Sequence, residues 1–173
     1  MYDALELSFV VFFGGVEILR RYSRAINDFW TDRVFGGLGR PQERYRVNSA
    51  SYYLWGITLI TLFAPRTIVC AALLILAFGD PLASAVGYRV GLWRFRNGKS
   101  LGGTLTFFLV SSLVVGLYLG LLADLGPATW IGLTACMALA GALAELFNGR
   151  LDDNLVIPVV SAGAGMLFLH AVG

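Results

Sequence analysis

Charged residues are scarce in this chain of 173 residues, at 14% of the sequence, and it contains only one histidine and two cysteines. Soluble domains carry about 25% charged residues and about 45 to 50% apolar residues. Here the apolar share is 57% and the mean hydropathy is +0.72. These values nearly exclude a water-soluble globule and indicate a protein whose solvent is the lipid bilayer.

The two cysteines, Cys70 and Cys136, both fall inside apolar stretches, so they indicate neither a disulfide framework nor a zinc site. The formal net charge is only +2, and we expect no nucleic-acid partner. His170 lies among apolar residues near the end of the chain, and we assign it no catalytic role.

Apolar runs predict an all-α integral membrane protein with about six transmembrane helices, because a helix needs about 20 apolar residues to cross a bilayer. The six predicted segments are 4–19, 49–63, 67–88, 104–123, 128–147 and 155–172. Pro65 and Arg66 separate the second segment from the third, which indicates a tight turn between two helices. The small size of the chain leaves room for a homodimer.

Basic residues predict the orientation, because cytoplasmic loops carry the excess of lysine and arginine. Twelve of the thirteen basic residues follow the first, third or fifth segment, and Arg66 is the exception. Six spans with both termini outside place these three loops in the cytoplasm, at the inner face of the plasma membrane. Tyr22, Ile26, Trp30 and Val34 recur every four residues in the first loop, which predicts an amphipathic helix on that membrane surface.

Two carboxylates inside predicted spans stand out, Asp80 and Glu145, because a charge there costs about 2.5 to 3.5 kcal/mol. Asp80 precedes Pro81, which predicts a helix broken beside a cavity. Both acids are therefore candidates for chemistry. The alternative for Asp80 is a helix cap, or a partner for an arginine in a packed bundle.

Glycines surround the second basic loop. Gly79, Ala83, Gly87 and Gly91 recur at a spacing of four, which is typical of close helix packing. The segment 98–104 (GKSLGGT) is not a P-loop, because the glycine spacing is wrong and no strand leads into it. Its backbone N–H groups, the helix N-terminus that follows and its lysine predict a phosphate cradle. The alternative is a basic turn that fixes topology.

Carboxylate and amide side chains gather in the loop 145–154 (ELFNGRLDDN), after the fifth segment. Hard oxygen ligands of this kind suit Mg²⁺, which commonly takes one or two protein carboxylates and shares its other positions with water and phosphate. The alternative is a solvated turn in which Asp153 or Asn154 caps the last helix. For Asp152 the solvated turn is the better interpretation.

Several motifs occur together at defined spacing. They are Arg40-Pro41-Gln42-Glu43, Asn48 to Tyr52, Asp80-x-x-Ala83-x-x-x-Gly87-x-x-x-Gly91, Lys99-x-x-x-Gly103-Thr104-x-x-Phe107, Glu145, and Asp153-Asn154-Leu155-x-Ile157-Pro158. Over residues 40–158 this set resembles the polyprenol kinase family, which includes dolichol kinase, phytol kinase and the CTP-dependent diacylglycerol kinase. The chain differs from the family pattern at Gly102, where an acidic residue is usual, and it lacks an upstream basic motif with histidine.

The resemblance implies a single transmembrane catalytic domain, 1–173, that uses CTP and Mg²⁺ to phosphorylate a membrane lipid alcohol such as dolichol, phytol or diacylglycerol. The expected catalytic residues are Asp80, Lys99, Glu145 and Asp153, and the three acids among them are also the expected Mg²⁺ ligands. The expected nucleotide-binding residues are Arg40, Arg46, Gly87, Gly91, Gly98, Ser100, Gly103, Thr104 and Asn154.

Two other functions remain open at this point. A phosphatidate cytidylyltransferase would use CTP to make a CDP-lipid and would release pyrophosphate instead of CDP, although the signature motifs of those enzymes are absent. A small transporter or membrane scaffold would place the acidic residues along an ion path.

Overall fold

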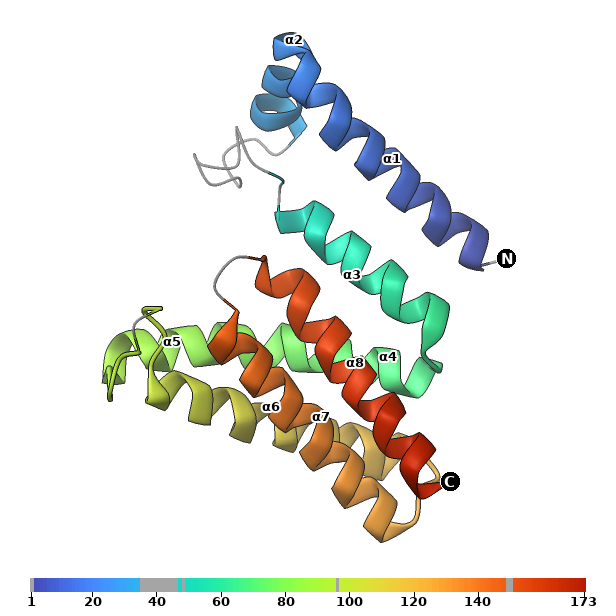
Figure 1. Ribbon diagram of the computed structural model, residues 1–173, viewed down its shortest axis with the longest axis vertical. Coiled ribbons are helices and arrows are strands. Elements are labelled where there is room, and N and C mark those ends of the chain that lie inside the picture. Colours follow the sequence, from blue (N-terminus) through green and yellow to red (C-terminus); the bar gives the residue numbers. More distant parts are fainter. Residues whose placement is uncertain (1, 35–46, 48, 96, 149–150) are drawn as a thin grey trace.

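The structure is a computed structural model, and it describes residues 2–34, 47, 49–95, 97–148 and 151–173. These residues fold almost entirely into helices, which confirms the all-α prediction (Figure 1). The helices are α1 (Tyr2–Tyr22), α2 (Arg24–Asp28), η1 (Phe29–Val34), α3 (Ser49–Phe63), α4 (Arg66–Leu74), η3 (Ile75–Gly79), α5 (Asp80–Val90), α6 (Leu101–Leu122), α7 (Pro127–Phe147) and α8 (Asp153–Val172).

Among the residues that the structure describes, four helical segments are long and apolar enough to cross a membrane. They are Arg66–Val90, Leu101–Leu122, Pro127–Phe147 and Asp153–Val172, which correspond to the last four predicted segments. The apolar helix α3 has 15 residues, so it is about 22 Å long, which is less than the roughly 30 Å of a bilayer core. The helices α1 and α3 lie where the first two segments were predicted, and their crossing of the membrane stays a prediction.

The expected break at Pro81 is wrong. The chain stays helical from Arg66 to Val90, and a π-helical stretch, η3, lies directly before Asp80. A proline ring crowds the carbonyl group four residues earlier in a helix, which here belongs to Ala77 inside η3. The wider π-helical turn gives the ring room. Asp80 is therefore carried on a continuous helix.

The core of the bundle lies among α4, η3, α6, α7 and α8. Phe107 of α6 is fully buried, and Gly79 and Gly141 allow two neighbouring helices to approach its ring. A Cβ atom at either glycine would lie 3.1 Å from the Phe107 ring. Small residues thus bring the helices around Asp80 close together.

The N-terminal helices attach to this bundle through α3, which packs against both α1 and α8 (Figure 1). Arg20 forms a buried ion pair with Glu17 at 2.9 Å, and the Ser51 hydroxyl donates to the same carboxylate at 3.0 Å. The predicted amphipathic segment is helical over α2 and η1, but Trp30 packs against Phe12 and Phe13 of α1. Its place on a membrane surface stays a prediction.

Candidate active site

The turn between α5 and α6 is shaped by two glycines. Gly91 ends α5 with a φ of +55°, and Gly98 has a φ of +85°, a region that side-chain-bearing residues rarely adopt. Within the turn, the backbone N–H of Phe95 donates to the carbonyl of Lys99 at 2.8 Å. The hydroxyl of Ser100 caps α6 by accepting from the N–H of Gly103 at 3.1 Å. This geometry fixes Lys99 directly before the first turn of α6.

Lys99 lies between two carboxylates. Its Nζ is 2.7 Å from Oε1 of Glu145 on α7 and 3.0 Å from Oδ2 of Asp153 at the start of α8. The Glu145 side chain is only 6% exposed, against 28% for Asp153. Burial lowers the pKa of Lys99, but hydrogen bonds and charges from Glu145 and Asp153 outweigh burial, so its pKa is raised. Lys99 is therefore an ammonium ion at neutral pH.

Neighbouring polar groups orient both carboxylates. The amide of Asn148 donates to Oδ1 of Asp153 at 2.8 Å, and it also donates to the carbonyl of Leu151 at 2.8 Å. The hydroxyl of Thr104 lies 3.5 Å from Oε2 of Glu145 and 3.2 Å from the carbonyl of Ser100. Lys99, Glu145 and Asp153 are therefore held as one unit between the turn before α6 and the helices α7 and α8.

Asp80 lies close to this unit without joining it. Its carboxylate is half-buried. It is repelled by the charges of Asp153 and Glu145 and attracted by that of Lys99. Within the described part of the chain it makes no hydrogen bond and no ion pair. Asp80 therefore lies within electrostatic range of the other three predicted residues, and its part in a common site stays a prediction.

The donor chemistry of the site fits Mg²⁺ in part. Among the residues that the structure describes, no three acidic, histidine or cysteine side chains form a ready metal cluster. Oxygen atoms of Glu145 and Asp153 nevertheless converge on one nitrogen, that of Lys99. Two carboxylates that meet at one cation are a ligand set that Mg²⁺ accepts when phosphate supplies further oxygens.

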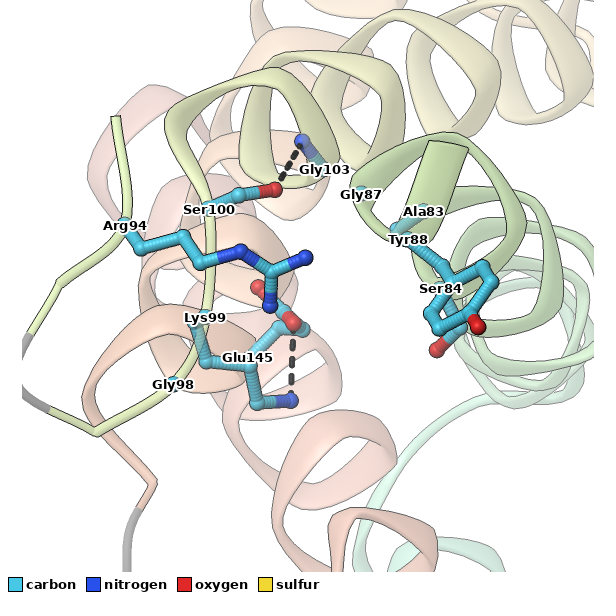
Figure 2. Close-up of a pocket in the computed structure, with 10 residues that line it drawn as sticks. All are labelled: Ala83, Ser84, Gly87, Tyr88, Arg94, Gly98, Lys99, Ser100, Gly103 and Glu145. Carbon is cyan, nitrogen blue, oxygen red and sulfur yellow. Dashed lines mark hydrogen bonds and ion pairs between the residues drawn. The ribbon is translucent and has the colours of Figure 1, made fainter. Parts of the chain in front are cut away.

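A pocket of about 250 Å³ opens beside Lys99, between α5, α6 and the turn that joins them (Figure 2). It is lined by Ala83, Ser84, Gly87, Tyr88, Arg94, Gly98, Lys99, Ser100, Gly103 and Glu145. Six of these ten were predicted as site residues, namely Gly87, Gly98, Lys99, Ser100, Gly103 and Glu145.

The other predicted site residues have different places. Asp153 and Thr104 contact Lys99 and Glu145 respectively, while Gly91 forms the C-cap of α5. Asn154 lies in the first turn of α8, where its N–H donates to Asp152 at 3.0 Å. Asp152 is therefore the cap of this helix, and the alternative that Asp153 or Asn154 caps it is wrong. Arg40 and Arg46 lie outside the described residues.

Comparison with known proteins decides the family. The CTP-dependent diacylglycerol kinase 1 of Schizosaccharomyces pombe is 32% identical over 172 residues, which cover 91% of this chain and 76% of that protein. This chain belongs to the polyprenol and diacylglycerol kinase family. An uncharacterized protein of Rickettsia prowazekii is 30% identical over 150 residues, or 83% of this chain and 71% of the relative. No protein-family profile and no solved structure matches the chain.

Three polar pocket residues of this kinase-family member were not predicted as site residues. Arg94 was assigned only to a basic loop, and Ser84 and Tyr88 were not considered. The signal for the last two was present, because they follow Asp80 at a spacing of four and eight residues on one face of α5.

The pocket floor is a close crossing of α5 and α6. A Cβ atom on Gly87 would lie 2.8 Å from the hydroxyl of Ser100, and one on Gly103 would lie 3.0 Å from the carbonyl of Ala83. The predicted small-residue packing is present at this crossing. These glycines lie in the pocket lining because two backbones meet there.

The substitution Gly103→Ala should therefore destabilise the protein by about 1 to 3 kcal/mol, since overpacking forces two backbones apart. Gly163 of α8 is a matched control, because a Cβ atom there would meet nothing within 4 Å. The change Gly163→Ala should leave the melting temperature unchanged or slightly raised. Thermal unfolding in detergent measures both, and equal melting temperatures for the two variants would contradict the crossing.

Proposed function

We propose that this protein is a CTP-dependent lipid kinase that phosphorylates the hydroxyl group of a membrane lipid alcohol, with diacylglycerol as its acceptor. The observation that carries the proposal is an ammonium group held by two carboxylates beside a pocket, at one end of an apolar bundle. The named activity of the Schizosaccharomyces pombe relative supports CTP as donor and favours diacylglycerol over dolichol and phytol.

The reaction can be assigned to the residues of the site. The lipid hydroxyl oxygen forms a bond to the γ-phosphorus, and the bond from that phosphorus to the β–γ bridging oxygen breaks, so CDP leaves. The hydroxyl proton passes to the carboxylate of Asp80. Lys99 and Arg94 neutralise the phosphates, and the N-terminus of α6, whose first turn lines the pocket at Gly103, favours their negative charge. The N–H groups of Gly98 and Gly103 donate within the protein, to the carbonyl of Phe95 and to the hydroxyl of Ser100. Phosphoryl transfer depends mostly on such positioning and charge.

Mg²⁺ would be held by Glu145 and Asp153, with Asp80 as a further predicted ligand. When bound, it supplies positive charge to the phosphate oxygens. The chain's own task is to keep the two carboxylates together. In the structure Lys99 contacts both of them, and Asn148 orients Asp153.

The arrangement of the helix ends supports a cytoplasmic active face. The site lies where α5 and α7 end and where α6 and α8 begin, and Arg89, Arg94 and Lys99 lie at this end. Ser49 at the start of α3 donates to Asp152 at 2.8 Å, which brings α3 to the same level. This supports six spans with both termini outside. The plasma membrane location and a homodimer stay predictions.

The test is product analysis with purified protein in lipid nanodiscs. Protein supplied with Mg²⁺, diacylglycerol and γ-labelled CTP should produce labelled phosphatidate and CDP, with much less product from ATP, dolichol or phytol. In a parallel reaction with phosphatidate in place of diacylglycerol, a CDP-lipid with labelled pyrophosphate would instead identify a cytidylyltransferase. Folded protein that labels no lipid in this panel would contradict the kinase, and cation flux without turnover would point to a transporter.

A further inference from the structure

We propose that Ser84 and Tyr88 of α5 form the subsite for the pyrimidine nucleoside of the nucleotide, with the base stacked on the Tyr88 ring. This inference rests on the proposed function, because it assigns one part of the CTP molecule to one part of the pocket. Under this proposal, Tyr88 is a residue that binds the CTP substrate.

The pocket has two chemically different walls. Figure 2 shows Lys99, Arg94 and Glu145 on one side, and Ser84 and Tyr88 across the opening on α5. Cations are the natural partners of phosphate groups. The wall on α5 carries two hydroxyl groups and an aromatic ring but no ionised side chain among the residues that line the pocket. The nucleoside is the uncharged part of CTP, so it fits this wall.

The positions of Asp80, Ser84 and Tyr88 along α5 indicate which part of the substrates each residue meets. Asp80, Ser84 and Tyr88 follow one another at a spacing of four, so they share a face of α5 over about 12 Å. Tyr88 lies near the end of α5, next to the turn with the basic residues, whereas Asp80 lies two turns further into the apolar bundle. A nucleotide arrives from water and a lipid arrives from the bilayer. The base therefore belongs at Tyr88 and the acceptor hydroxyl at Asp80.

Tyr88 is free to receive a planar group. Its side chain is 84% exposed, and it makes no ring contact with another aromatic residue in the part of the chain that the structure describes. Every base has a π face that stacks on an aromatic ring. The hydroxyl of Ser84 can both donate and accept a hydrogen bond, which suits the alternating donors and acceptors on the edge of cytosine.

The test compares Tyr88→Leu with Tyr88→Phe, which keeps the ring, and with Tyr22→Leu as a matched control. Tyr22 lies at the end of α1, is 88% exposed and does not line the pocket. Loss of stacking in Tyr88→Leu should raise the KM for CTP and weaken the binding of labelled CMP about 10-fold each. The kcat at saturating CTP, and inhibition by inorganic tripolyphosphate, should stay near wild type. Tyr88→Phe and Tyr22→Leu should bind CMP as the wild type does.

Two results would overturn the subsite. In the first, Tyr88→Leu binds CMP as tightly as the wild type does. In the second, Tyr88→Leu has a raised KM for diacylglycerol and an unchanged KM for CTP, which would place Tyr88 at the acceptor or at the membrane interface. If Tyr88→Leu fails to fold, Ser84→Ala gives the answer, because it should weaken CMP binding about 5-fold without changing inhibition by tripolyphosphate. CMP binding needs no turnover, so failure of the subsite and failure of the kinase activity are separate outcomes.

Discussion

Replacing Lys99 with methionine should lower the turnover number of the lipid kinase reaction about 100- to 1,000-fold, the usual effect of removing a charge-stabilising donor from an active site. The ammonium group is the cation that both Glu145 and Asp153 contact, and it lines the pocket proposed for CTP. Without it, two carboxylates would face the triphosphate with less positive charge to offset them. The measurement is kcat with saturating CTP and diacylglycerol.

The same substitution should also destabilise the fold, by about 3 kcal/mol, because it leaves the buried carboxylate of Glu145 without its counter-charge. A second change, Glu145→Gln, removes that unpaired charge. The double variant Lys99→Met/Glu145→Gln should therefore recover much of the melting temperature and none of the activity. Recovery of the melting temperature would show that the lost stability comes from the unpaired Glu145 carboxylate. The kcat of Lys99→Met is corrected for the folded fraction at the assay temperature, so that lost turnover is separated from unfolding.

Arg89→Met is the matched control for Lys99, since Arg89 is an exposed basic residue near the end of α5 that does not line the pocket. It should keep nearly wild-type turnover and stability. A Lys99→Met protein that retains more than a tenth of wild-type turnover would show that the phosphates are bound elsewhere.

Helix positions were predictable from the sequence because their signals are local. Apolar runs bounded by arginine, glycine or proline gave the segments, and the predicted 49–63 coincides with α3. The error at Pro81 also has a local cause, since proline usually breaks a helix. What the sequence does not reveal is the π-helical η3, which packs beside Phe107 and Gly141 and accommodates the proline.

The site was predictable as a chemical set but not as a geometry. Lys99, Glu145 and Asp153 could be grouped because each lies near the same end of a predicted span. Their direct contact depends on how the ends of α6, α7 and α8 meet, which no local pattern encodes. The helix cap illustrates this limit, because Asp152 and its two successors have similar chemistry and only the backbone geometry selects Asp152. Tyr88 was overlooked because exposed aromatic residues are common in membrane proteins.

The substitution Asp80→Asn, unlike Lys99→Met, should lower turnover without lowering stability. Turnover should fall about 100- to 10,000-fold, the range for loss of a general base. Stability should stay unchanged or rise, because the Asp80 carboxylate makes no hydrogen bond or ion pair within the described residues and is repelled by Asp153 and Glu145. Removing a charge from an apolar helix is also favourable in itself. The measurements are kcat and thermal unfolding in the same detergent.

Asp124→Asn is the control with the same chemical change, since Asp124 is exposed between α6 and α7, at the end of the bundle away from the site. It should leave both kcat and the melting temperature near wild type. If Asp80→Asn lowered the melting temperature by several degrees and its loss of turnover followed the loss of folded protein, Asp80 would be a packing residue. Its place beside Pro81 also allows this structural role.

Metal dependence separates the two roles that Asp80 can have in the reaction. A variant that has lost only the base should keep its affinity for Mg²⁺, so excess Mg²⁺ should not restore turnover. An acceptor lipid whose hydroxyl group has a lower pKa should restore part of the rate, because it needs less help from a base. A variant that has lost a metal ligand should instead recover turnover as Mg²⁺ is raised. Because Glu145 and Asp153 already converge on one cation while Asp80 stands apart from them, we expect the first result. Recovery with Mg²⁺ would move Asp80 from proton acceptor to metal ligand and leave the acceptor of the proton to be found.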